Sequence, residues 1–440
     1  MRCPTLTELP PPPPGRTGWP WTEESPQLPD TMPDGSPWPR VSIVTPSYNQ
    51  ARFIEETIRS VLLQGYPDLE YIIVDGGSTD GSVEIIRKYE PWLAYWVSEK
   101  DAGQADAINK GWQRSSGEIL AWLNSDDTYE PAAIGTAVSL LECYPDVAMI
   151  AGDCRVIDAS GNVIRRLPAG EYNLINQLFS NAIPQPGTFV RRPIAEAIGY
   201  LDGSMHYVFD ADFWMRLSLA GAKIVRWSSL FANYRYWSNS KSVSVPVRFD
   251  LEKIRLLDKL YSTPDLSSEI VLARPLAYGC LYLRIGLGYQ MSGDWQTARS
   301  YVERAIKEYP KVCDSLVRCS SLAEVVSAAE NAAGTARQFV ALLEDVAQSN
   351  GLVLNSDKVY SNLMSVVRTV AAWNAYQRDD LAGVRKSLWQ VARHRPAALL
   401  LNRGLISIGL EALVGPNLMK RLRMITHGQF RVWRGQDHRR

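Results

Sequence analysis

Short apolar runs alternate with segments of helical period from about residue 41 to residue 130, and this alternation restricts the possible fold more than any other feature. The apolar runs are rich in Ile, Val, Leu and aromatic residues; they read VSIVTPS, EYIIVDGGS, LAYWVSE and GEILAWLNSDD. Between them, apolar residues recur at helical spacing, as at Ile54, Ile58 and Val61. Strands that alternate with helices favour parallel β-α-β units, so the sequence predicts an α/β domain.

Polar residues follow each of the four predicted strands. These clusters are Thr45 to Asn49, Asp75 to Ser78, Glu99 to Asp101, and Asn124 to Asp127. Ligands of open α/β sheets bind at the carboxyl ends of the strands. Because parallel strands end at the same edge of a sheet, the four clusters are predicted to meet at one ligand-binding edge.

Asp126 and Asp127 stand side by side after an apolar run, Ile119 to Leu123, that is predicted to be a strand buried on both faces. Burial and like charge both raise the pKa of a carboxyl group, so the pair is unfavourable by itself. A cation would remove this difficulty, and hard oxygen ligands suit Mg²⁺ or Mn²⁺, which can bridge to a diphosphate. An N-cap for the next helix would use only one of the two carboxylates.

Three further segments carry candidate binding residues. Asp75 precedes two glycines and could accept a hydrogen bond from a nucleobase or ribose, although a turn aspartate would explain it equally well. Asp106, Asn109 and Lys110 share adjacent turns of a predicted helix. There, Lys110 could meet a phosphate or lie on a solvated helix face. The start of that helix at Gly103 could offer backbone N–H groups to an anion.

The stretch YVFDADFWMRL places Asp210 and Asp212 just before a predicted helix. One carboxylate can cap the helix or interact with its dipole. The other is then available as a general base for an acceptor hydroxyl.

Composition narrows the class of protein. The 440 residues predict two or three domains, and 46% hydrophobic with 21% charged residues is typical of a soluble globular chain. Lys plus Arg equal Asp plus Glu at 47 each, so no nucleic acid partner is expected. No stretch of about 18 apolar residues is expected to span a membrane. The six dispersed cysteines are interpreted as reduced thiols of a cytoplasmic protein.

The chain is predicted to have three zones. Residues 1–38 are rich in proline and are expected to form a disordered arm. Residues 39–262 contain the α/β pattern, and residues 263–440 are expected to form an all-α domain with a basic tail. Within it, Gly288 to Pro310 and, more weakly, Ala375 to Pro396 have the spacing of tetratricopeptide-like helix pairs, with an ordinary helical bundle as the alternative.

Two nucleotide-binding classes are disfavoured by missing motifs. The sequence contains no GxxxxGK[ST] string, which a phosphate-loop NTPase requires. The first strand is followed by TPSYNQARF, which lacks the glycine triplet of dinucleotide-binding domains.

Six strings, in order, resemble the family 2 glycosyltransferases of the GT-A fold over roughly residues 40–260. They are VSIVTPSYNQARFIEETIRSVLLQ, YIIVDGGSTDGS, SEKDAGQADAINKG, LNSDD, QPGTFVRR and FDADFWMRL. The resemblance implies a GT-A domain, Rossmann-like in topology, that performs an inverting transfer of a sugar. The donor would be a nucleotide-diphosphate sugar, with a UDP-sugar expected, and the acceptor a hydroxyl group.

The resemblance also implies roles for single residues. Asp127 would ligate Mg²⁺ or Mn²⁺, Asp126 would lie at the metal, ribose and diphosphate, and Asp210 would be the catalytic base. The remaining positions would line the donor site: Thr45, Pro46, Tyr48, Asn49, Asp75, Gly103, Asp106, Asn109, Lys110, Asn124 and Ser125.

The chain departs from the family pattern at two positions. Asn124 stands where the metal motif often begins with an aspartate, and Trp237 stands in a region where many relatives carry a histidine. Both changes put the number of protein ligands for the metal in question.

The resemblance implies a glycan or lipid-linked acceptor and cell-surface polysaccharide or glycolipid synthesis at the inner face of the membrane. An apolar stretch that ends in a basic tail, residues 398–435, could lie peripherally on anionic lipid or pack on its own bundle. The alternatives to a transferase are a sugar nucleotidyltransferase and an inactive GT-A-like scaffold protein.

Overall fold

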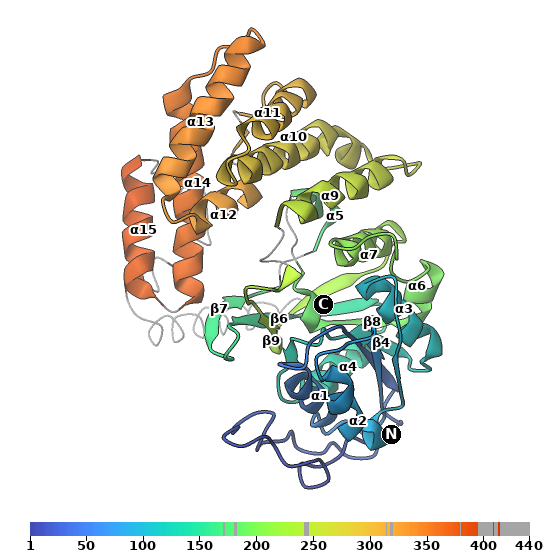
Figure 1. Ribbon diagram of the computed structural model, residues 1–440. Coiled ribbons are helices and arrows are strands. Elements are labelled where there is room, and N and C mark those ends of the chain that lie inside the picture. The colour runs from blue at the N-terminus through green and yellow to red at the C-terminus, as the bar shows by residue number, and fades with distance from the viewer. Residues whose placement is uncertain are drawn as a thin grey trace, which may run out of the picture. The chain divides into compact units, whose positions relative to one another are not determined.

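The computed structural model describes residues 1–440 except 170–171, 180–182, 242–245, 314, 317–319, 379, 395–407, 409–411 and 414–440. The chain divides into two compact units, Met1–Arg274 and Pro275–Arg440. The first unit is α/β and the second is helical (Figure 1). This is the predicted order of fold classes, with a boundary inside a helix rather than at residue 262.

Among the described residues, nine strands form one mixed sheet in the first unit. Their bounds are β1 (Val41–Ser47), β2 (Leu69–Asp75), β3 (Tyr95–Ser98), β4 (Ile119–Trp122), β5 (Thr128–Tyr129), β6 (Met149–Ile157), β7 (Val163–Leu167), β8 (Thr188–Arg191) and β9 (Ile224–Arg235).

Helices lie between these strands. They are α1 (Ile54–Leu62), α2 (Ser82–Lys88), η1 (Glu90–Trp92), α3 (Gln104–Arg114), α4 (Ala133–Cys143), α5 (Leu174–Phe179), η2 (Gln185–Gly187), α6 (Arg192–Ala197), α7 (Phe209–Leu219) and α9 (Pro246–Tyr261).

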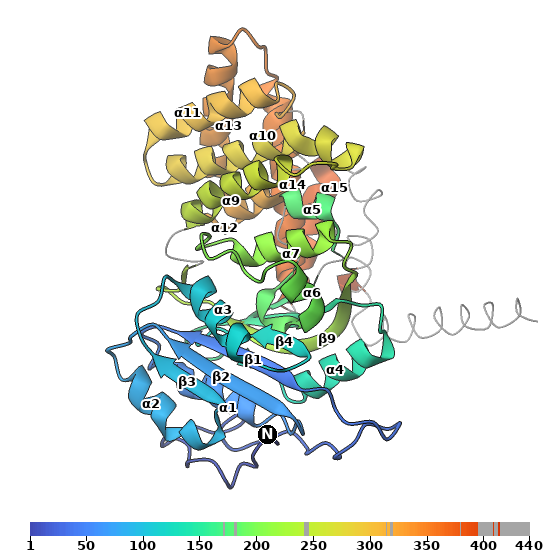
Figure 2. The same ribbon diagram turned by 90° about the vertical axis from the view of Figure 1, so that its right-hand side faces the viewer.

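The strand order is β3-β2-β1-β4-β8-β6-β9-β5, and its first four strands run parallel to one another, side by side in Figure 2. Ser47 pairs with Asp75, and Asp75 pairs with Ser98, so these strands end in register. The prediction that the polar clusters meet at one edge is therefore confirmed. The order reverses between β1 and β4, where ligands of open α/β sheets bind.

The two faces of the sheet carry different helices. Apolar residues of α1, α2 and α4 form one core with alternate residues of β1, β2 and β4, including Ile43, Tyr71 and Ala121. The opposite face holds Trp122, which contacts Trp112 of α3 edge-on and stacks on Trp214 of α7. Both faces of β4 are thus covered, as predicted for this strand.

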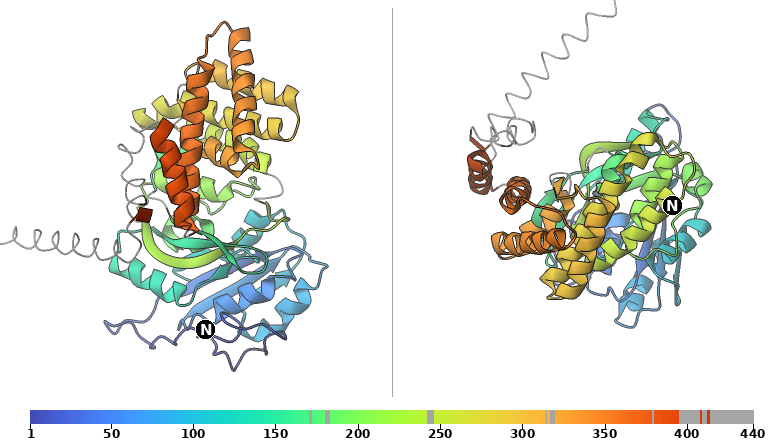
Figure 3. Two further views of the ribbon diagram at one scale, coloured as in Figure 1. Left: turned by 90° about the vertical axis from the view of Figure 1, so that its left-hand side faces the viewer. Right: turned by 90° about the horizontal axis from the view of Figure 1, so that it is seen from above.

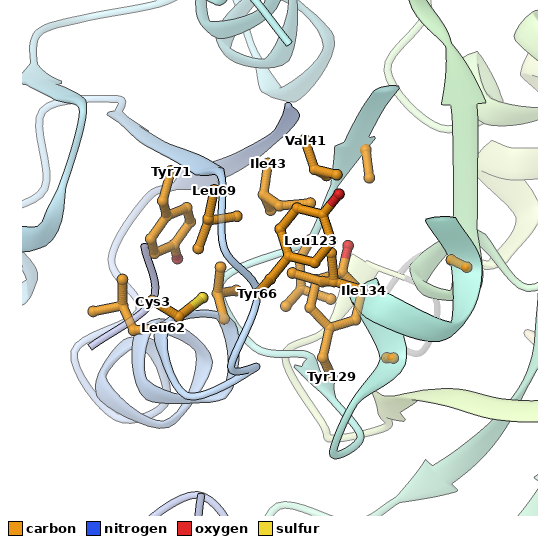
Figure 4. Packing of buried hydrophobic residues seen from close by; sticks show 14 of the residues in the cluster. Cys3, Val41, Ile43, Leu62, Tyr66, Leu69, Tyr71, Leu123, Tyr129 and Ile134 are labelled. Atoms are coloured by element: carbon orange, nitrogen blue, oxygen red, sulfur yellow. The ribbon is translucent and has the colours of Figure 1, made fainter. Parts of the chain in front are cut away.

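Residues 1–38 do not form the disordered arm that their proline content suggested. Cys3, Leu9 and Trp38 are part of the buried core, and Figure 4 shows Cys3 among Leu62 and Leu69. The backbone N–H of Cys3 also donates to the carbonyl of Tyr66 over 2.9 Å. The prediction failed because prolines and their neighbours keep carbonyl oxygens that another element can bind.

Arg59 of α1 makes that connection. Its guanidinium is buried and donates to the backbone carbonyls of Pro10, Pro20 and Trp21 at 2.8 to 3.0 Å. A buried charge is tolerated when it is fully hydrogen-bonded, so the segment and the arginine depend on each other.

Helix α10 (Ser268–Met291) begins in the first unit and continues into the helical unit from Pro275. The helical unit also contains α11 (Trp295–Glu308), α12 (Ser320–Ala328), α13 (Ala332–Ser349), α14 (Ser356–Gln377) and α15 (Leu381–His394). Figure 3 shows α13, α14 and α15 (orange to red) alongside one another. Helix pairs occur at both predicted hairpins, and Tyr289 of α10 stacks on Tyr301 of α11 with 5.8 Å between ring centroids. Their assignment to the tetratricopeptide class stays a prediction. The predicted basic tail lies outside the described residues.

Two details of this unit differ from expectation. Within the described ranges, α10 alone has the length and apolar composition of a membrane span, with a mean hydropathy of 1.4, although 67% of its apolar window is buried in the protein. A buried core helix has the same composition, so this is weak evidence for a span. Cys280 on α10 is disulfide-bonded, which the interpretation of six reduced thiols missed, whereas Cys3, Cys143, Cys154 and Cys313 form no disulfide.

Candidate active site

The candidate site begins where β4 ends, at the side-chain amide of Asn124. Its oxygen accepts a 2.6 Å hydrogen bond from Gln104 at the start of α3. Its nitrogen donates to Asp127 Oδ2 and to Gln185 Oε1, both at 3.1 Å. Gln185 is fixed in turn by a 2.8 Å bond to the carbonyl of Trp122. Asn124 therefore joins four segments of the chain at the sheet edge.

Asp127 turns into the protein. It is 1% exposed, and its Oδ1 accepts the backbone N–H of Arg235 at 2.8 Å while Oδ2 takes the bond from Asn124. These contacts arise because β5 begins at the next residue and pairs with the end of β9. The predicted metal ligand is thus engaged by two protein donors.

Asp126 is the partly exposed member of the pair. Its Oδ2 accepts a 3.0 Å hydrogen bond from the indole N–H of Trp237, and its carbonyl accepts one from Arg235 at 2.7 Å. Trp237 lies edge-on against Phe53, and the Arg235 guanidinium covers the same phenyl ring. An aromatic and cationic support therefore holds Asp126 at the surface of the site.

The two carboxylates are electrostatically coupled. Burial and the adjacent charge of Asp126 raise the pKa of Asp127 well above its ordinary value. Burial also raises the pKa of Asp126, against the opposing effects of the Trp237 hydrogen bond and the Arg235 charge. The pair is therefore short of positive charge, as the sequence predicts.

The start of α3 approaches the segment before α7. A Cβ on Gly103, whose φ is +117°, would lie 3.3 Å from the His206 ring nitrogen, so glycine permits this approach. Lys241 connects the two segments, because its ammonium donates to Gln104 Oε1 at 3.0 Å and to the His206 carbonyl at 3.4 Å.

Asp210 and Asp212 occupy the first turn of α7 and have different surroundings. Asp210 is partly exposed and accepts the N–H of Ala211 at 2.7 Å. Asp212 is 1% exposed and bridges Arg216 at 2.6 Å and Lys259 at 2.7 Å. Asp212 therefore forms buried ion pairs with two cationic side chains, and it does not serve as the helix cap that one of the two aspartates was predicted to be.

The segment that leads into α7 is held by another helix. Glu252 of α9 accepts the backbone N–H groups of His206, Tyr207 and Val208 at 2.5 to 2.9 Å. A carboxylate that takes these donors orients the first turn and the Asp210 that it carries.

The ends of β1 and β2 form the other side of the site. A Cβ on Gly76 would lie 2.9 Å from Asp101 Oδ2 and 3.3 Å from the ring of Tyr48, which is 63% exposed. Among these predicted residues, Tyr48 presents a surface to a ligand. Asn49 instead donates its N–H to Ser78 and accepts the N–H of Thr79.

Several predicted donor-site residues have structural contacts. The Asp75 carboxylate is buried and accepts bonds from Gly77, Ser78 and Ser98, which is the turn role that the sequence left open. Thr45 lies in the core with its hydroxyl 3.0 Å from that of Tyr71. Pro46 and Ser125 are also buried.

The three predicted residues of α3 are likewise occupied. Asp106 accepts the N–H of Ala102, and Asn109 exchanges two hydrogen bonds with the backbone of Leu201. Lys110 lies 3.3 Å from both Asp106 and Glu99. Burial alone would lower the pKa of Lys110, but these two carboxylates raise it. The Lys110 charge is thus balanced within the protein.

Four residues at the site were not among those predicted: Gln104, Gln185, His206 and Lys241. Gln104 and Gln185 lie inside strings that carried the family resemblance, so position within those strings was the available signal. His206 and Lys241 had none, because only the fold brings residues 104, 206 and 241 together.

Comparison with known proteins identifies the family. The model of Glycosyl transferase family 2 matches residues 42–214. An uncharacterized glycosyltransferase of Mycobacterium tuberculosis is 30% identical over 191 residues, which cover 41% of this chain and 70% of that protein. The glycosyltransferase TuaG of Bacillus subtilis, named for teichuronic acid biosynthesis, is 43% identical over 95 residues, 21% of this chain and 38% of TuaG.

Solved structures give more distant matches. S. aureus TarS 1–349 has a TM-score of 0.47 at 17% identity, covering 75% of this chain and 91% of that chain. The mannosyltransferase PcManGT from Pyrobaculum calidifontis, in complex with GDP-Man and Mn²⁺, has a TM-score of 0.46 at 18% identity, covering 74% and 89%. From the family model and the M. tuberculosis relative, the chain belongs to the family 2 glycosyltransferases.

Proposed function

We propose that this glycosyltransferase moves a sugar, with inversion, from a nucleotide-diphosphate sugar to a hydroxyl acceptor. The observation that carries the proposal is the convergence, through Lys241, of the Asn124–Asp126 segment with the residues that lead into α7 and Asp210. A donor-binding strand end and a partly exposed carboxylate at the start of a helix are the two parts that such a transfer requires.

The nucleotide is expected at the switch point between β1 and β4. Tyr48 offers an exposed aromatic face there, and Gly76 allows the backbone to approach Asp101 closely. A uridine nucleotide, the family expectation, is the first to test.

The residues fit Mg²⁺ or Mn²⁺ only as an ion shared with the donor. No group of three or more His, Cys, Asp or Glu in the described part of the chain could hold a metal. Asp126 offers a partly exposed carboxylate, whereas both oxygens of Asp127 are taken. One carboxylate suffices for Mg²⁺ that keeps waters and substrate phosphate oxygens. Such an ion would neutralise charge on the departing diphosphate. We therefore propose Asp126 as the ligand in place of Asp127.

Asp210 is proposed as the general base. It would accept the proton of the acceptor hydroxyl while that oxygen attacks the anomeric carbon opposite the leaving diphosphate. Asp212 cannot take this role without breaking its bonds to Arg216 and Lys259.

The acceptor is proposed to be a glycan or lipid-linked glycan in cell-surface polymer synthesis, with the name of TuaG as the supporting observation. A cytoplasmic enzyme with peripheral contact at the inner face of the membrane would suit such an acceptor. A tetratricopeptide-like pairing of α10 with α11 would provide a surface for further partners.

The test is a donor screen followed by turnover. Thermal shift with UDP-, GDP- and TDP-sugars in the presence of Mn²⁺ selects the donor, and release of the free nucleoside diphosphate measures transfer or hydrolysis. Release from one donor supports the transferase. Release of pyrophosphate from a nucleoside triphosphate and a sugar phosphate would indicate a nucleotidyltransferase, and no turnover with any donor would indicate a scaffold protein.

A further inference from the structure

Lys241 holds a positive charge at the site by contacts with neutral oxygens. Its two hydrogen bonds go to the side-chain carbonyl of Gln104 and the backbone carbonyl of His206. Among the described residues, no carboxylate oxygen lies within 4.0 Å of its nitrogen. An ammonium group has three hydrogens to donate, and these contacts use two of them.

The surrounding charges attract Lys241 from a distance. Burial lowers the pKa of Lys241, and the charges of Glu252, Asp101 and Asp126 oppose this effect only in part. Glu252 is committed to the backbone before α7, and Asp101 accepts the N–H of Gly103. Both carboxylates are therefore engaged elsewhere, and Lys241, an exposed residue, is accessible to a ligand anion.

Lys110, for which the sequence suggested a phosphate contact, has charged partners in place of neutral ones. It contacts two carboxylates, Glu99 and Asp106, which a phosphate would have to displace. Lys241 could keep both of its neutral partners and still donate to an anion.

Two side chains beside Asp126 add no negative charge for a metal. Position 124 carries a neutral amide, and the indole of Trp237 can only donate, which it does to Asp126. The site therefore has fewer groups that attract a divalent ion, and it has a lysine beside them.

We infer that Lys241 binds the diphosphate of the donor and supplies fixed positive charge to the leaving group, so that donor binding does not depend wholly on a divalent ion. This rests on the proposed function. In the transfer, the bond from the anomeric carbon to the phosphate oxygen breaks and its electron pair stays on that oxygen. The acceptor oxygen forms the new bond, and its proton goes to Asp210. Lys241 stabilises the charge on the diphosphate and exchanges no proton.

Calorimetric titration of the full chain with UDP and GDP, each in EDTA and in Mn²⁺, tests this inference. The wild-type protein is expected to bind one of them in EDTA. Lys241→Met should weaken that binding by about 10- to 100-fold, the usual effect of losing a hydrogen bond to a charged group. Lys241→Arg, which keeps the charge, should remain within a few-fold of wild type. The control is Lys223→Met, which removes an exposed lysine paired with Asp146.

Equal binding by wild type and Lys241→Met in EDTA overturns the inference while leaving the proposed function in place. Binding by the wild type only in Mn²⁺ also overturns it. Absence of binding in both conditions overturns the proposed function and this inference together. Melting temperatures of all variants separate lost contact from lost fold, and Lys241→Gln provides a polar replacement if the methionine variant is unstable.

Discussion

At the scale of single residues, adjacent carboxylates have opposite tasks because consecutive side chains leave the backbone in different directions. Asp127 faces inward and ties the start of β5 to Arg235, whereas Asp126 faces the site. The repulsion between them is tolerated because both have nitrogen donors nearby.

This division predicts different outcomes for the two positions. Asp126→Asn should abolish the gain in nucleotide affinity from Mn²⁺ while the melting temperature stays within about 2 °C. Asp127→Ala leaves two buried donors without a partner and should lower the free energy of unfolding by about 2 kcal/mol, since relief of the repulsion with Asp126 offsets part of the cost. Urea denaturation and calorimetry measure both. A stable Asp127→Ala protein that has lost only its response to Mn²⁺ would restore Asp127 as the ligand.

Substitutions of Asp210 and Asp212 should likewise have different effects, one on turnover and the other on stability. Asp210→Asn should reduce turnover by about 10²- to 10⁴-fold with donor affinity unchanged, because it removes a general base and keeps the shape. Asp212→Asn should cost about 3 kcal/mol of stability by leaving Lys259 and Arg216 without their buried partner. Steady-state kinetics and urea denaturation distinguish them. Normal turnover by Asp210→Asn would refute the proposed base.

At the scale of elements, the N-terminal segment acts as a packed layer on α1. Its prolines prevent helix and sheet, yet its carbonyls satisfy Arg59 and its side chains extend the core. An irregular segment can be ordered when another element supplies the donors that it lacks.

Deletion of residues 1–38 should therefore lower the melting temperature markedly and promote aggregation, because it exposes apolar core and leaves Arg59 buried without its partners. Arg59→Met should cost roughly 2–4 kcal/mol by the same mechanism. Differential scanning calorimetry compares both with Arg16→Met, which loses only an exposed contact on Trp21. If the deletion and the wild type melted together, the segment would not be part of the cooperative unit.

Helix α7 is likewise held by other elements. Glu252 of α9 binds the backbone that leads into its first turn, and Lys259 of the same helix anchors Asp212. The position of Asp210 thus depends on α9, which is 36 or more residues away in sequence.

At the scale of the whole molecule, the ion pair between Asp202, in the segment before α7, and Lys259 of α9 should contribute to global stability in a pH-dependent way. Burial alone would raise the pKa of Asp202, but hydrogen bonds from Lys259 and Ser204 outweigh it and lower the pKa to about 2 from an ordinary value of 3.8. A depressed folded-state pKa stabilises above the unfolded value, and this stability is lost as the pH falls from about 4 to about 2.

Asp202→Asn should therefore weaken the loss of stability between about pH 4 and about pH 2. At pH 6 it should lower the free energy of unfolding by about 1 kcal/mol, because the Asp202–Lys259 pair is partly exposed and solvent screens it. Urea midpoints at pH 6 and at pH 2.5 to 4.5 measure this. Asp146→Asn, at the exposed pair with Lys223, should change them little. An unaltered acid limb in Asp202→Asn would assign the acid sensitivity to other carboxylates.

The sequence by itself determined the parallel strands, the edge where they end, and the family. These features are encoded by local signals. A short apolar run such as Ile119–Trp122 favours a buried strand, and apolar residues at helical spacing, as in α1, favour a helix with one buried face. The prediction of Asp126 and Asp210 as site residues rested on strings that are contiguous in the chain.

The tertiary structure decided which side chains remain available for a ligand. Asp75, Asn109 and Asp127 have residue types suited to binding, but protein donors and acceptors from distant segments engage them. Lys241 has no motif, yet it meets Gln104 and His206 because the chain folds back there. Hydrogen-bond partners distant in sequence depend on which segments become neighbours, and packing of the whole domain sets that neighbourhood.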